Sequence, residues 1–417
     1  MTTSAAPRPA DPNCDLQAGL LDVETARARL LADVQPVWEM EHVSLFAAVG
    51  RVLANTVLAT SDMPPFDRTA VDGYGVGGPG PGPFQVVGYL PAGAGGLPRV
   101  GAGEAVRLLT GAAVPEGVWA VAMQEGCRMD PRSGVVSPTL MRGANIRRRG
   151  EDFGAGEAVL EAGTRLDPRH LALLAAAGIG TVAVRRRPRV ALFSAGDELL
   201  EPGMPHAPGA IHDSNRPMLA ALLQGLGAEV HDLGLLPDRR PAIAAALEGA
   251  SRFDSIVASG GVSGSEADHL LGALRDAGGQ GSWCAVALKP GKPLVYGGIG
   301  TARCLFLPGN PMAALAGGFL FARPLVARLA GAADGGLRSL PARLASGWDR
   351  KPGREEFAPA MLRPGPDLVV ERISKPGSAR LMPLVAADGL VRVGRDAGAL
   401  RVGDAVEFLP FAGILGG

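Results

Sequence analysis

The sequence has little of what marks several classes of protein. Its 417 residues include only four cysteines, and no two of them form a Cys-x-x-Cys pair. Neither a zinc site nor a disulfide framework is therefore indicated, and a reducing, cytoplasmic environment fits best. Lys plus Arg (41) equals Asp plus Glu (41), so no global charge favours nucleic acid as a partner.

Signals for membranes and secretion are also missing. The apolar run at 171–184 is taken as the longest, and it contains Gly178 and Gly180. It is shorter than the roughly 20 residues that span a bilayer, so we expect no membrane partner. Residues 1–15 are polar and proline-rich, without the basic start and apolar core of a signal peptide, and we expect them to be disordered.

Common catalytic and phosphate-binding motifs are absent as well. No G-x-x-x-x-G-K-[ST] occurs, and no G-x-G-x-x-G opens a helical pattern. None of the six histidines is spaced from another like a metal pair, and no Ser-His-Asp order is recognisable. What the chain has in quantity is Gly (60) and Pro (35), so turns and loops should be important.

The clearest pattern lies at 188–330, where apolar runs of strand length alternate with helical periodicity. The expected strands are 189–194, 229–233, 254–259, 283–288 and 304–307, and the expected helices are 215–226, 241–250, 265–277 and 312–330. This alternation predicts a doubly wound parallel sheet with right-handed crossovers.

The flanking regions have a different texture. Short β-like runs between Gly and Pro predict a small β domain at 61–144 and a last β domain at 331–417. Helices capped by Asp22 and Asp167 favour a discontinuous linker domain made of 16–60 and 145–187.

In an open parallel sheet, ligands bind outside the carboxyl ends of the strands. The loop after the third expected strand contains Gly260, Gly261 and Ser263, and it is typical of a phosphate cradle. A tight turn capped by Ser263 or Ser265 explains the same residues.

Charged residues are expected at the same edge. Glu198, Asp238 and Asp268 could supply the carboxylates that magnesium takes together with substrate phosphates, although capping is the more frequent role of a single acid at a helix start. Lys289 and Lys292 stand in a stiff Pro-Gly frame, and two ammonium groups so close favour an anion between them.

Two further clusters lie outside the sheet domain. Asp67 and Asp72 stand in a Pro-rich loop, and three arginines at 147–149 precede two acids. The arginines form either a solvated face or an ion-pair network around a ligand.

Nine segments in this order resemble the molybdopterin molybdenumtransferase family, which includes bacterial MoeA and the E domain of gephyrin. They are PPFDRTAVDGYGV (64–76), RLLTGAAVPEG (107–117), AVAMQE (120–125), GANIRRRGEDF (143–153), LFSAGDEL (192–199), DSNRPML (213–219), ASGGVSGSEAD (258–268), LKPGKPL (288–294) and LPGNPMAAL (307–315). The resemblance implies a split helical linker domain, a β domain, a doubly wound molybdopterin-binding domain and a C-terminal β barrel, assembled as a homodimer.

The resemblance also implies an activity. Enzymes of this family use magnesium and molybdate to convert adenylylated molybdopterin into molybdenum cofactor with release of AMP, and the product passes to acceptor enzymes. Lys289 and Lys292 would hold molybdate or phosphate, and Asp238, Asp268 and Glu198 would coordinate magnesium or orient water. The remaining expected substrate contacts, several of them from a dimer partner, are Asp72, Thr110, Arg147, Asp152, Arg354 and Ser378.

The sequence departs from the family pattern at a few positions. Gly264 and Ser265 stand for Val and Gly in the third loop, and His269 stands for an aromatic residue. Ala313 replaces a serine whose hydroxyl could help to bind the oxyanion, and Ala195 replaces a threonine. These changes leave open a divergent, non-catalytic scaffold of the gephyrin type. The upstream adenylyltransferase, which shares the sheet domain, is a third alternative.

Overall fold

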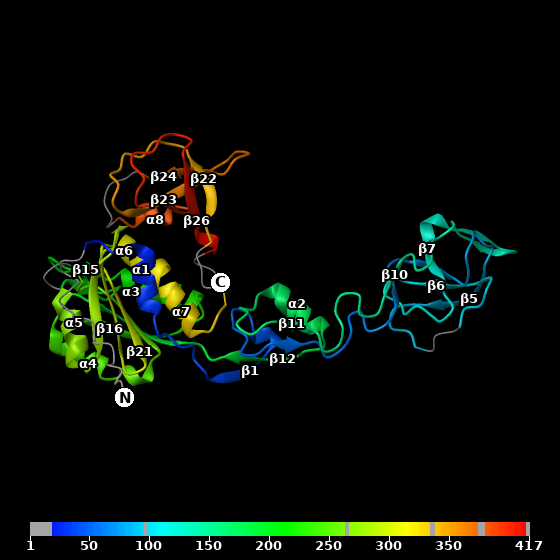
Figure 1. The fold of residues 1–417 in the computed structure, drawn as a ribbon, viewed down its shortest axis with the longest axis horizontal. Coiled ribbons are helices and arrows are strands. Elements are labelled where there is room, and N and C mark those ends of the chain that lie inside the picture. Colours follow the sequence, from blue (N-terminus) through cyan, green and yellow to red (C-terminus); the bar gives the residue numbers. More distant parts are fainter. Residues whose placement is uncertain (1–18, 96–98, 263–266, 334–337, 374–379, 414–417) are drawn as a thin grey trace, which may run out of the picture.

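The largest sheet of the molecule has six strands in the order β16-β13-β17-β21-β20-β18. The structure, a computed structural model, describes residues 19–95, 99–262, 267–333, 338–373 and 380–413 (Figure 1). The strands are β13 (Arg189–Ala195), β16 (Glu229–Leu236), β17 (Ser255–Ser259), β18 (Gln280–Ala285), β20 (Pro293–Ile299) and β21 (Ala302–Leu307). The neighbours β16, β13, β17 and β21 run parallel, as the alternating pattern predicts.

Helices cover both faces of this sheet, which is therefore doubly wound. α4 (Arg240–Leu247) and α5 (Ala267–Asp276) pack on one face, while α3 (Asn215–Gly225) and the long helix at the C-terminal end of the domain pack on the other. Strand β13 contributes side chains to the hydrophobic cores on both faces of the sheet, because Val190 and Leu192 face one side and its alternate residues face the other.

The expectation of an entirely parallel sheet is wrong at one strand, β20, which lies between β18 and β21. β20 runs antiparallel to both β18 and β21, and the strand pattern at 293–299 was missed. The connections are too short for a crossover helix: only seven residues separate β18 from β20, and two separate β20 from β21. A chain with such short connections can only turn back on itself. As a result, the carboxyl end of β18 lies at the same edge as that of β21.

One continuous helical stretch is long and apolar enough to cross a membrane by length and composition. It comprises α6 (Pro311–Gly317), a π-helical turn at Gly318–Ala322 and α7 (Arg323–Leu329). The expectation that 171–184 is the longest apolar run is therefore wrong. Inside the molecule 83% of the most apolar window of this stretch is buried, and that burial accounts for its composition.

The first helix, α1 (Val23–Leu31), begins after Asp22, whose carboxylate accepts the N–H of Thr25 at 2.8 Å. Its buried residues Val23, Ala26 and Leu30 belong to the same core as α3 and α7. Although the sequence pattern grouped this helix with the linker, its apolar face is covered by the sheet domain.

A narrow linker joins the sheet domain to a second domain at the other end of the molecule (Figure 1). β1 (Met40–Ser44) pairs with β12 (Thr181–Arg185), so two distant parts of the sequence lie side by side. The shorter pair is β2 (Val57–Leu58) with β11 (Ala158–Leu160), and both pairs lie beside α2 (Pro168–Ala176).

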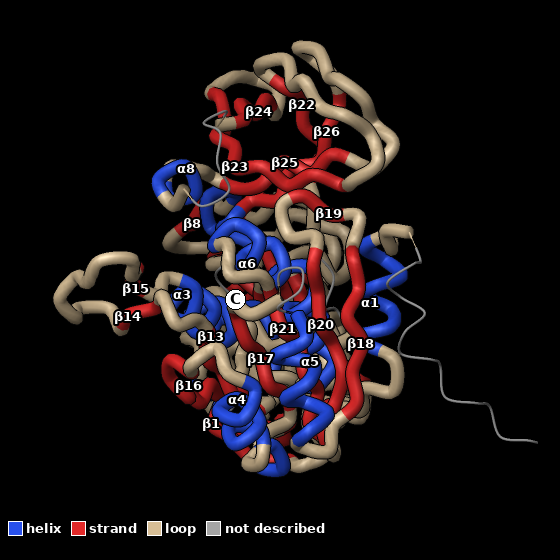
Figure 2. The backbone as a smooth tube through the Cα atoms, turned by 90° about the vertical axis from the view of Figure 1, so that its left-hand side faces the viewer, coloured by secondary structure: helices blue, strands red, loops and turns tan. Residues whose placement is uncertain are grey.

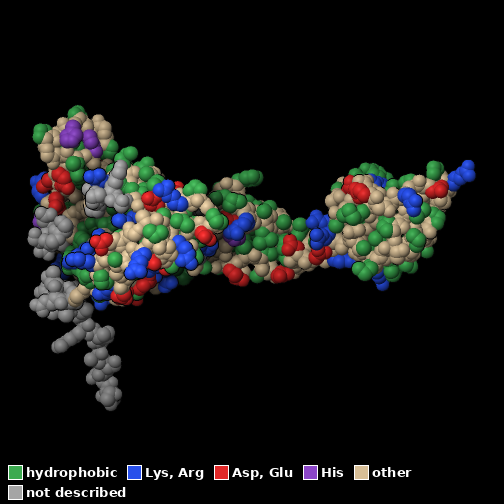
Figure 3. Space-filling model, turned by 90° about the horizontal axis from the view of Figure 1, so that it is seen from above, with side chains coloured by type: hydrophobic (Ala, Val, Ile, Leu, Met, Phe, Trp, Pro, Cys, Tyr) green, Lys and Arg blue, Asp and Glu red, His purple; other side chains and the backbone are tan. Residues whose placement is uncertain are grey.

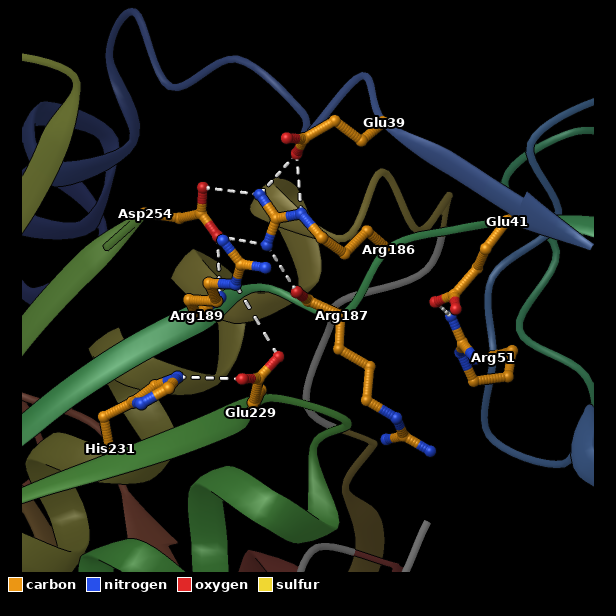
Figure 4. Close-up of polar contacts among 9 residues, drawn as sticks. All are labelled: Glu39, Glu41, Arg51, Arg186, Arg187, Arg189, Glu229, His231 and Asp254. Carbon is orange, nitrogen blue, oxygen red and sulfur yellow. Dashed lines mark hydrogen bonds and ion pairs between the residues drawn. The ribbon is translucent and has the colours of Figure 1, made fainter. Parts of the chain in front are cut away.

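Ion pairs lock the junction between the linker and the sheet domain (Figure 4). The guanidinium of Arg186 donates to both carboxylate oxygens of Asp254, at 2.9 and 3.1 Å, and its Nε donates to Glu39 at 2.6 Å. Asp254 also accepts the backbone N–H of Arg189. One arginine thus ties both linker chains to the start of β17.

A small β domain lies at the far end of the molecule from the sheet domain (Figure 1). Its main sheet has the order β5-β6-β4-β7. These strands are β4 (Gly73–Val76), β5 (Gln85–Leu90), β6 (Glu104–Leu108) and β7 (Ala120–Met123). Three short pieces, β3 (Arg68–Thr69), β10 (Ile146–Arg147) and the β8–β9 hairpin (Arg128–Asp130, Gly134–Val136), complete it.

The C-terminal domain is a closed barrel, because the two strands at the ends of its spatial order, which are the second and the fourth along the chain, also pair with each other. Its strands are β22 (Leu340–Leu344), β23 (Glu355–Arg363), β24 (Val369–Arg372), β25 (Gly389–Val393) and β26 (Ala405–Pro410). A two-residue strand from the sheet domain, β19 (Leu288–Lys289), joins the edge of β23 (Figure 2). The predicted multidomain class, α/β with flanking β domains, is confirmed.

Candidate functional site

The candidate site lies where the strand order of the large sheet reverses. From β13 the chain moves outward to β16, and it then crosses back to β17 on the other side of β13. Such a switch point leaves a crevice outside the carboxyl ends of the two central strands. The loops that follow β13, β16, β17, β18 and β21 all meet at this edge.

Two glycines shape the loop after β17. Gly260 has φ of +100°, and a Cβ there would lie 2.0 Å from the carbonyl oxygen of Ala195, so only glycine fits. Gly261 has φ of +61°, and a Cβ there would lie 3.3 Å from Oδ1 of Asp238. This close backbone approach is the feature that the cradle hypothesis requires. Ser263, which belongs to the same hypothesis, lies outside the described residues.

Asn215 joins three loops of the crevice, and it was not among the predicted site residues. Its side-chain amide donates to Oγ of Ser259 at 2.8 Å and to the carbonyl oxygen of Gly309 at 2.7 Å. The carboxylate of Asp213 caps the same helix by accepting the N–H of Asn215 at 3.0 Å. The only sequence signal was an Asp-Ser-Asn run before a helical pattern, which reads equally well as an ordinary cap.

One carboxylate oxygen of Asp238 is buried. Its Oδ1 has no hydrogen-bond partner in the described part of the chain, and His269 Nδ1 lies 3.6 Å away. The backbone N–H of Asp238 donates to Asp197 Oδ1 at 3.1 Å, which fixes the loop after β16 against the loop after β13. A buried carboxylate oxygen without a donor suits a cation.

The other two predicted magnesium ligands are not gathered around Asp238 by the described atoms. Glu198 is exposed, and Asp268 lies in the first turn of α5 with a side chain that the structure does not describe. Among the described residues, no group of three His, Cys, Asp or Glu is placed to hold a metal ion. The three-carboxylate site therefore stays a prediction.

The two predicted lysines lie at the crevice edge, between β18 and β20. Lys292 is exposed, whereas Lys289 is half-exposed and its ammonium lies 3.3 Å from the carboxylate of Glu356 in the barrel. The sequence predicted two neighbouring ammonium groups with an anion between them. It did not reveal that Lys289 also has a carboxylate of the barrel beside it.

The loop between the lysines packs against the start of α6. A Cβ on Gly291 would lie 3.5 Å from the Cβ of Ala313, which is almost fully buried. The hydroxyl that Ala313 lacks would therefore stand beside the Pro-Gly frame of the lysines. On the barrel side, Arg354 is exposed and its carbonyl oxygen accepts Arg350 at 2.6 Å, while Ser378 lies outside the described residues.

The β-domain candidates form a second, exposed group. Asp72 accepts the N–H and the hydroxyl of Thr110 at 2.6 and 2.7 Å, and these hydrogen bonds lower the pKa of its carboxyl. Arg147 pairs with Glu151 at 2.6 Å, and Asp152 is exposed. All four lie in or beside the β domain, at the opposite end of the molecule from the crevice (Figure 1).

The three consecutive arginines are ion-paired. Arg148 contacts Asp67 at 2.5 Å, Arg149 contacts Asp62, and Arg147 contacts Glu151. Basic and acidic side chains accordingly stand together where the linker narrows before the β domain (Figure 3). The ion pairs are thus observed on an exposed face, and the expectation that they surround a ligand stays a prediction.

Comparison with known proteins matches three family models along the chain. They describe the MoeA N-terminal region (domain I and II) at residues 21–178, a probable molybdopterin binding domain at 191–328 and the MoeA C-terminal region (domain IV) at 341–411. Together they span the linker, the β domain, the doubly wound sheet and the barrel.

Curated relatives and solved structures agree with these models. A molybdopterin molybdenumtransferase of Haemophilus influenzae is 38% identical over 317 residues, which cover 75% of this chain and 78% of the relative. Molybdopterin molybdenumtransferase 2 of Mycobacterium tuberculosis is 31% identical over 91% of this chain and 97% of its own length. The crystal structure of a molybdopterin biosynthesis MoeA protein from Pyrococcus horikoshii aligns with a TM-score of 0.81 at 30% identity, covering 94% of this chain and 100% of that one.

Proposed function

Because the chain belongs to the MoeA family of molybdopterin molybdenumtransferases, we propose that it inserts molybdenum from molybdate into adenylylated molybdopterin and releases AMP. One observation carries the proposal beyond family membership. The switch-point crevice combines a glycine loop, the buried Oδ1 of the partly buried Asp238 and the lysine loop at one edge of the sheet. An anionic substrate with a phosphoanhydride needs this combination of backbone donors, cations and carboxylates.

The glycine loop and the lysines bind different parts of the substrates. The backbone of Gly260 and Gly261 approaches the phosphates of the substrate, because no side chain stands in the way. Lys289 and Lys292 attract the divalent oxyanion, and Arg354 and Ser378 add contacts from the barrel. With alanine at position 313, the lysines and the backbone must hold the oxyanion without that hydroxyl.

We assign magnesium to Asp238, together with Glu198 and Asp268. The Oδ1 of Asp238, which accepts no hydrogen bond from the described residues, supports this assignment, since an acid that only capped a helix would accept a backbone N–H with that oxygen. When bound, magnesium would neutralise the charge of the phosphoanhydride. The same carboxylates orient the water that attacks the phosphorus.

The β-domain residues contribute from a second copy of the chain. Asp72, Thr110, Arg147 and Asp152 stand too far along the elongated molecule to reach their own crevice (Figure 1). We therefore place them against the crevice of a homodimer partner. Exposed apolar side chains on and beside the linker, including Trp38 and Phe46, support such an association because isolated chains rarely leave several of them in water.

The product and the compartment follow from the same family assignment. Molybdenum cofactor is handed to acceptor enzymes, and the reaction is placed in the cytoplasm. Cys127, Cys284 and Cys304, the cysteines of the described residues, form no disulfide, which is consistent with a reducing compartment.

An assay of AMP release tests the proposal. Wild-type protein is incubated with adenylylated molybdopterin, molybdate and magnesium, and AMP is quantified by chromatography. We expect molybdate-dependent release, and we expect Asp238→Asn to lower it at least roughly a hundredfold without changing the melting temperature much.

Asp276→Asn is the matched control. Asp276 lies in the same domain but forms an exposed ion pair with Arg240, so its loss should leave the rate unchanged. If wild-type protein releases no AMP above the blank, the enzymatic assignment fails and a non-catalytic scaffold is the better description. If Asp238→Asn retains full activity, the site is misplaced.

A further inference from the structure

The lysine loop of the crevice is attached to the barrel as well as to the sheet. Leu288 pairs with Glu355 and Lys289 pairs with Glu356 in a parallel register (Figure 2). The N–H of Glu355 also donates to the carbonyl oxygen of Ala287 at 2.7 Å. Residues opposite each other in a ladder project on the same face, which accounts for the contact between Lys289 and Glu356.

Glu356 is a buried carboxylate among several cations. Only 5% of this residue is exposed, and its oxygens lie 3.3 Å from Nζ of Lys289 and 3.5 Å from Nε of Arg350. Burial lowers the pKa of Arg372, and the negative charge of Glu356 opposes that shift. Three positive side chains therefore depend on one negative charge.

The three cations are not equally free to move. The side chain of Arg350 is fully enclosed, and its guanidinium donates to the carbonyl oxygens of Gly394, Ala397 and Arg354. Arg372 lies over the ring of Trp348, 4.7 Å from its centroid. Lys289 is half-exposed, and Glu356 is the one ion-pair partner found for it among the described residues.

Loss of the Glu356 charge would therefore move Lys289 first. The enclosed guanidinium of Arg350 and the partly buried guanidinium of Arg372 would then repel the ammonium without compensation, and the flexible lysine stem would swing toward water. The arginines, held by carbonyl oxygens and an aromatic ring, would keep their places.

We propose that Glu356 is a positioning residue that holds the Lys289 ammonium at the mouth of the crevice for capture of the oxyanion. The inference rests on the proposed function, because it takes Lys289 as an oxyanion ligand. The barrel therefore has a defined role in the site, because its Glu356 supplies the negative charge that positions the ammonium of Lys289.

The test measures binding of molybdate alone to the full-length chain by isothermal titration calorimetry. Glu356→Gln keeps the size of the side chain and removes its charge. We expect the Kd for molybdate to rise roughly tenfold, and the KM for molybdate to rise in parallel while kcat changes less than about twofold.

A double-mutant cycle separates positioning from a general structural effect. In the Lys289→Ala background, Glu356→Gln should add less than about a twofold change in Kd, because the group that Glu356 positions is already gone. Glu355→Gln is the matched control: this neighbouring buried acid pairs with Arg392 and faces away from Lys289. It should leave the Kd for molybdate unchanged.

Glu356→Asp covers the case in which Glu356→Gln does not fold. It retains the negative charge beside Arg350 and Arg372 but withdraws the carboxylate by one methylene, so a smaller rise in Kd is expected. An unchanged Kd in these variants, or an equal rise in the Lys289→Ala background, would overturn the inference while leaving the proposed function intact. A wild-type chain that neither binds molybdate nor releases AMP would defeat both.

Discussion

The crevice of the sheet domain and the candidate cluster of the β domain hold their residues in different ways. In the crevice, Gly260 touches the backbone of β13 and Asn215 ties the loops after β17 and β21 together. In the β domain, Asp72 and Arg147 are exposed or half-exposed and contact residues of their own domain. A buried frame has one arrangement that satisfies its polar groups, whereas exposed ion pairs exchange readily with water or a ligand.

This difference has a functional meaning. A crevice that must bind phosphate and oxyanion benefits from fixed donors, because nothing then has to reorganise during the reaction. A surface that meets another copy of the chain must give up its own ion pairs when the copies associate. Substitutions in the two regions should therefore be distinguished by whether stability or activity falls.

The largest effect is expected for Gly260→Ala. A Cβ would collide with the carbonyl oxygen of Ala195 at 2.0 Å, so the free energy of unfolding should fall by about 3 kcal/mol and AMP release should be lost. Gly278→Ala is the control, because Gly278 also has a positive φ (+83°) but nothing lies within 4 Å of its Cβ position. It should cost about 1 kcal/mol. Equal losses in denaturant melts would show that the crevice loop is not packed as described.

An intermediate effect is expected for Asn215→Ala. The change removes two hydrogen bonds, to Ser259 and Gly309, and should lower the free energy of unfolding by about 2 kcal/mol. Gln224→Ala, on the exposed side of the same helix, should change it by less than about 0.5 kcal/mol. Urea melts of both variants check the prediction. A stable Asn215→Ala protein with normal AMP release would show that Asn215 does not hold the crevice loops together.

The smallest effect on stability is expected for Arg147→Ala. Arg147 is exposed and pairs with Glu151 four residues away, so the melting temperature should not change measurably. AMP release should nevertheless fall roughly tenfold, because in the proposed dimer the guanidinium meets an anion in the partner's crevice. Arg148→Ala, which breaks the neighbouring pair with Asp67, should leave the rate unchanged. Equal rates of AMP release for wild type and Arg147→Ala would show that Arg147 of the β domain takes no part in the reaction.

Short-range patterns predicted the sheet domain well. Strand β13 and helix α3 lie within a residue or so of their expected bounds, because apolar runs and capping residues are local signals. Strand β20 was missed because this short antiparallel segment contains two glycines, Gly297 and Gly298, and does not alternate with a helix. Helix α1 was assigned to the linker because periodicity reveals an apolar face but not the surface that will cover it.

The site was predicted in part. The switch-point rule located the loops that carry Gly260, Asp238 and Lys289 at one edge of the sheet. It could not identify Asn215, whose partners come from two other loops, or Glu356, which stands 67 residues from Lys289. Such contacts depend on how separate elements pack, and no local pattern encodes that.

The central claim is that one active site combines the crevice of one chain with the β domain of another, and a complementation experiment tests it most directly. Asp72→Ala and Asp238→Asn chains carrying different tags are co-expressed, the heterodimer is isolated with both tags, and AMP release is measured. We predict that each variant alone is inactive and that the heterodimer, with one intact combined site, recovers about half of the wild-type activity. An inactive heterodimer, or full activity of the Asp72→Ala protein alone, would contradict the account.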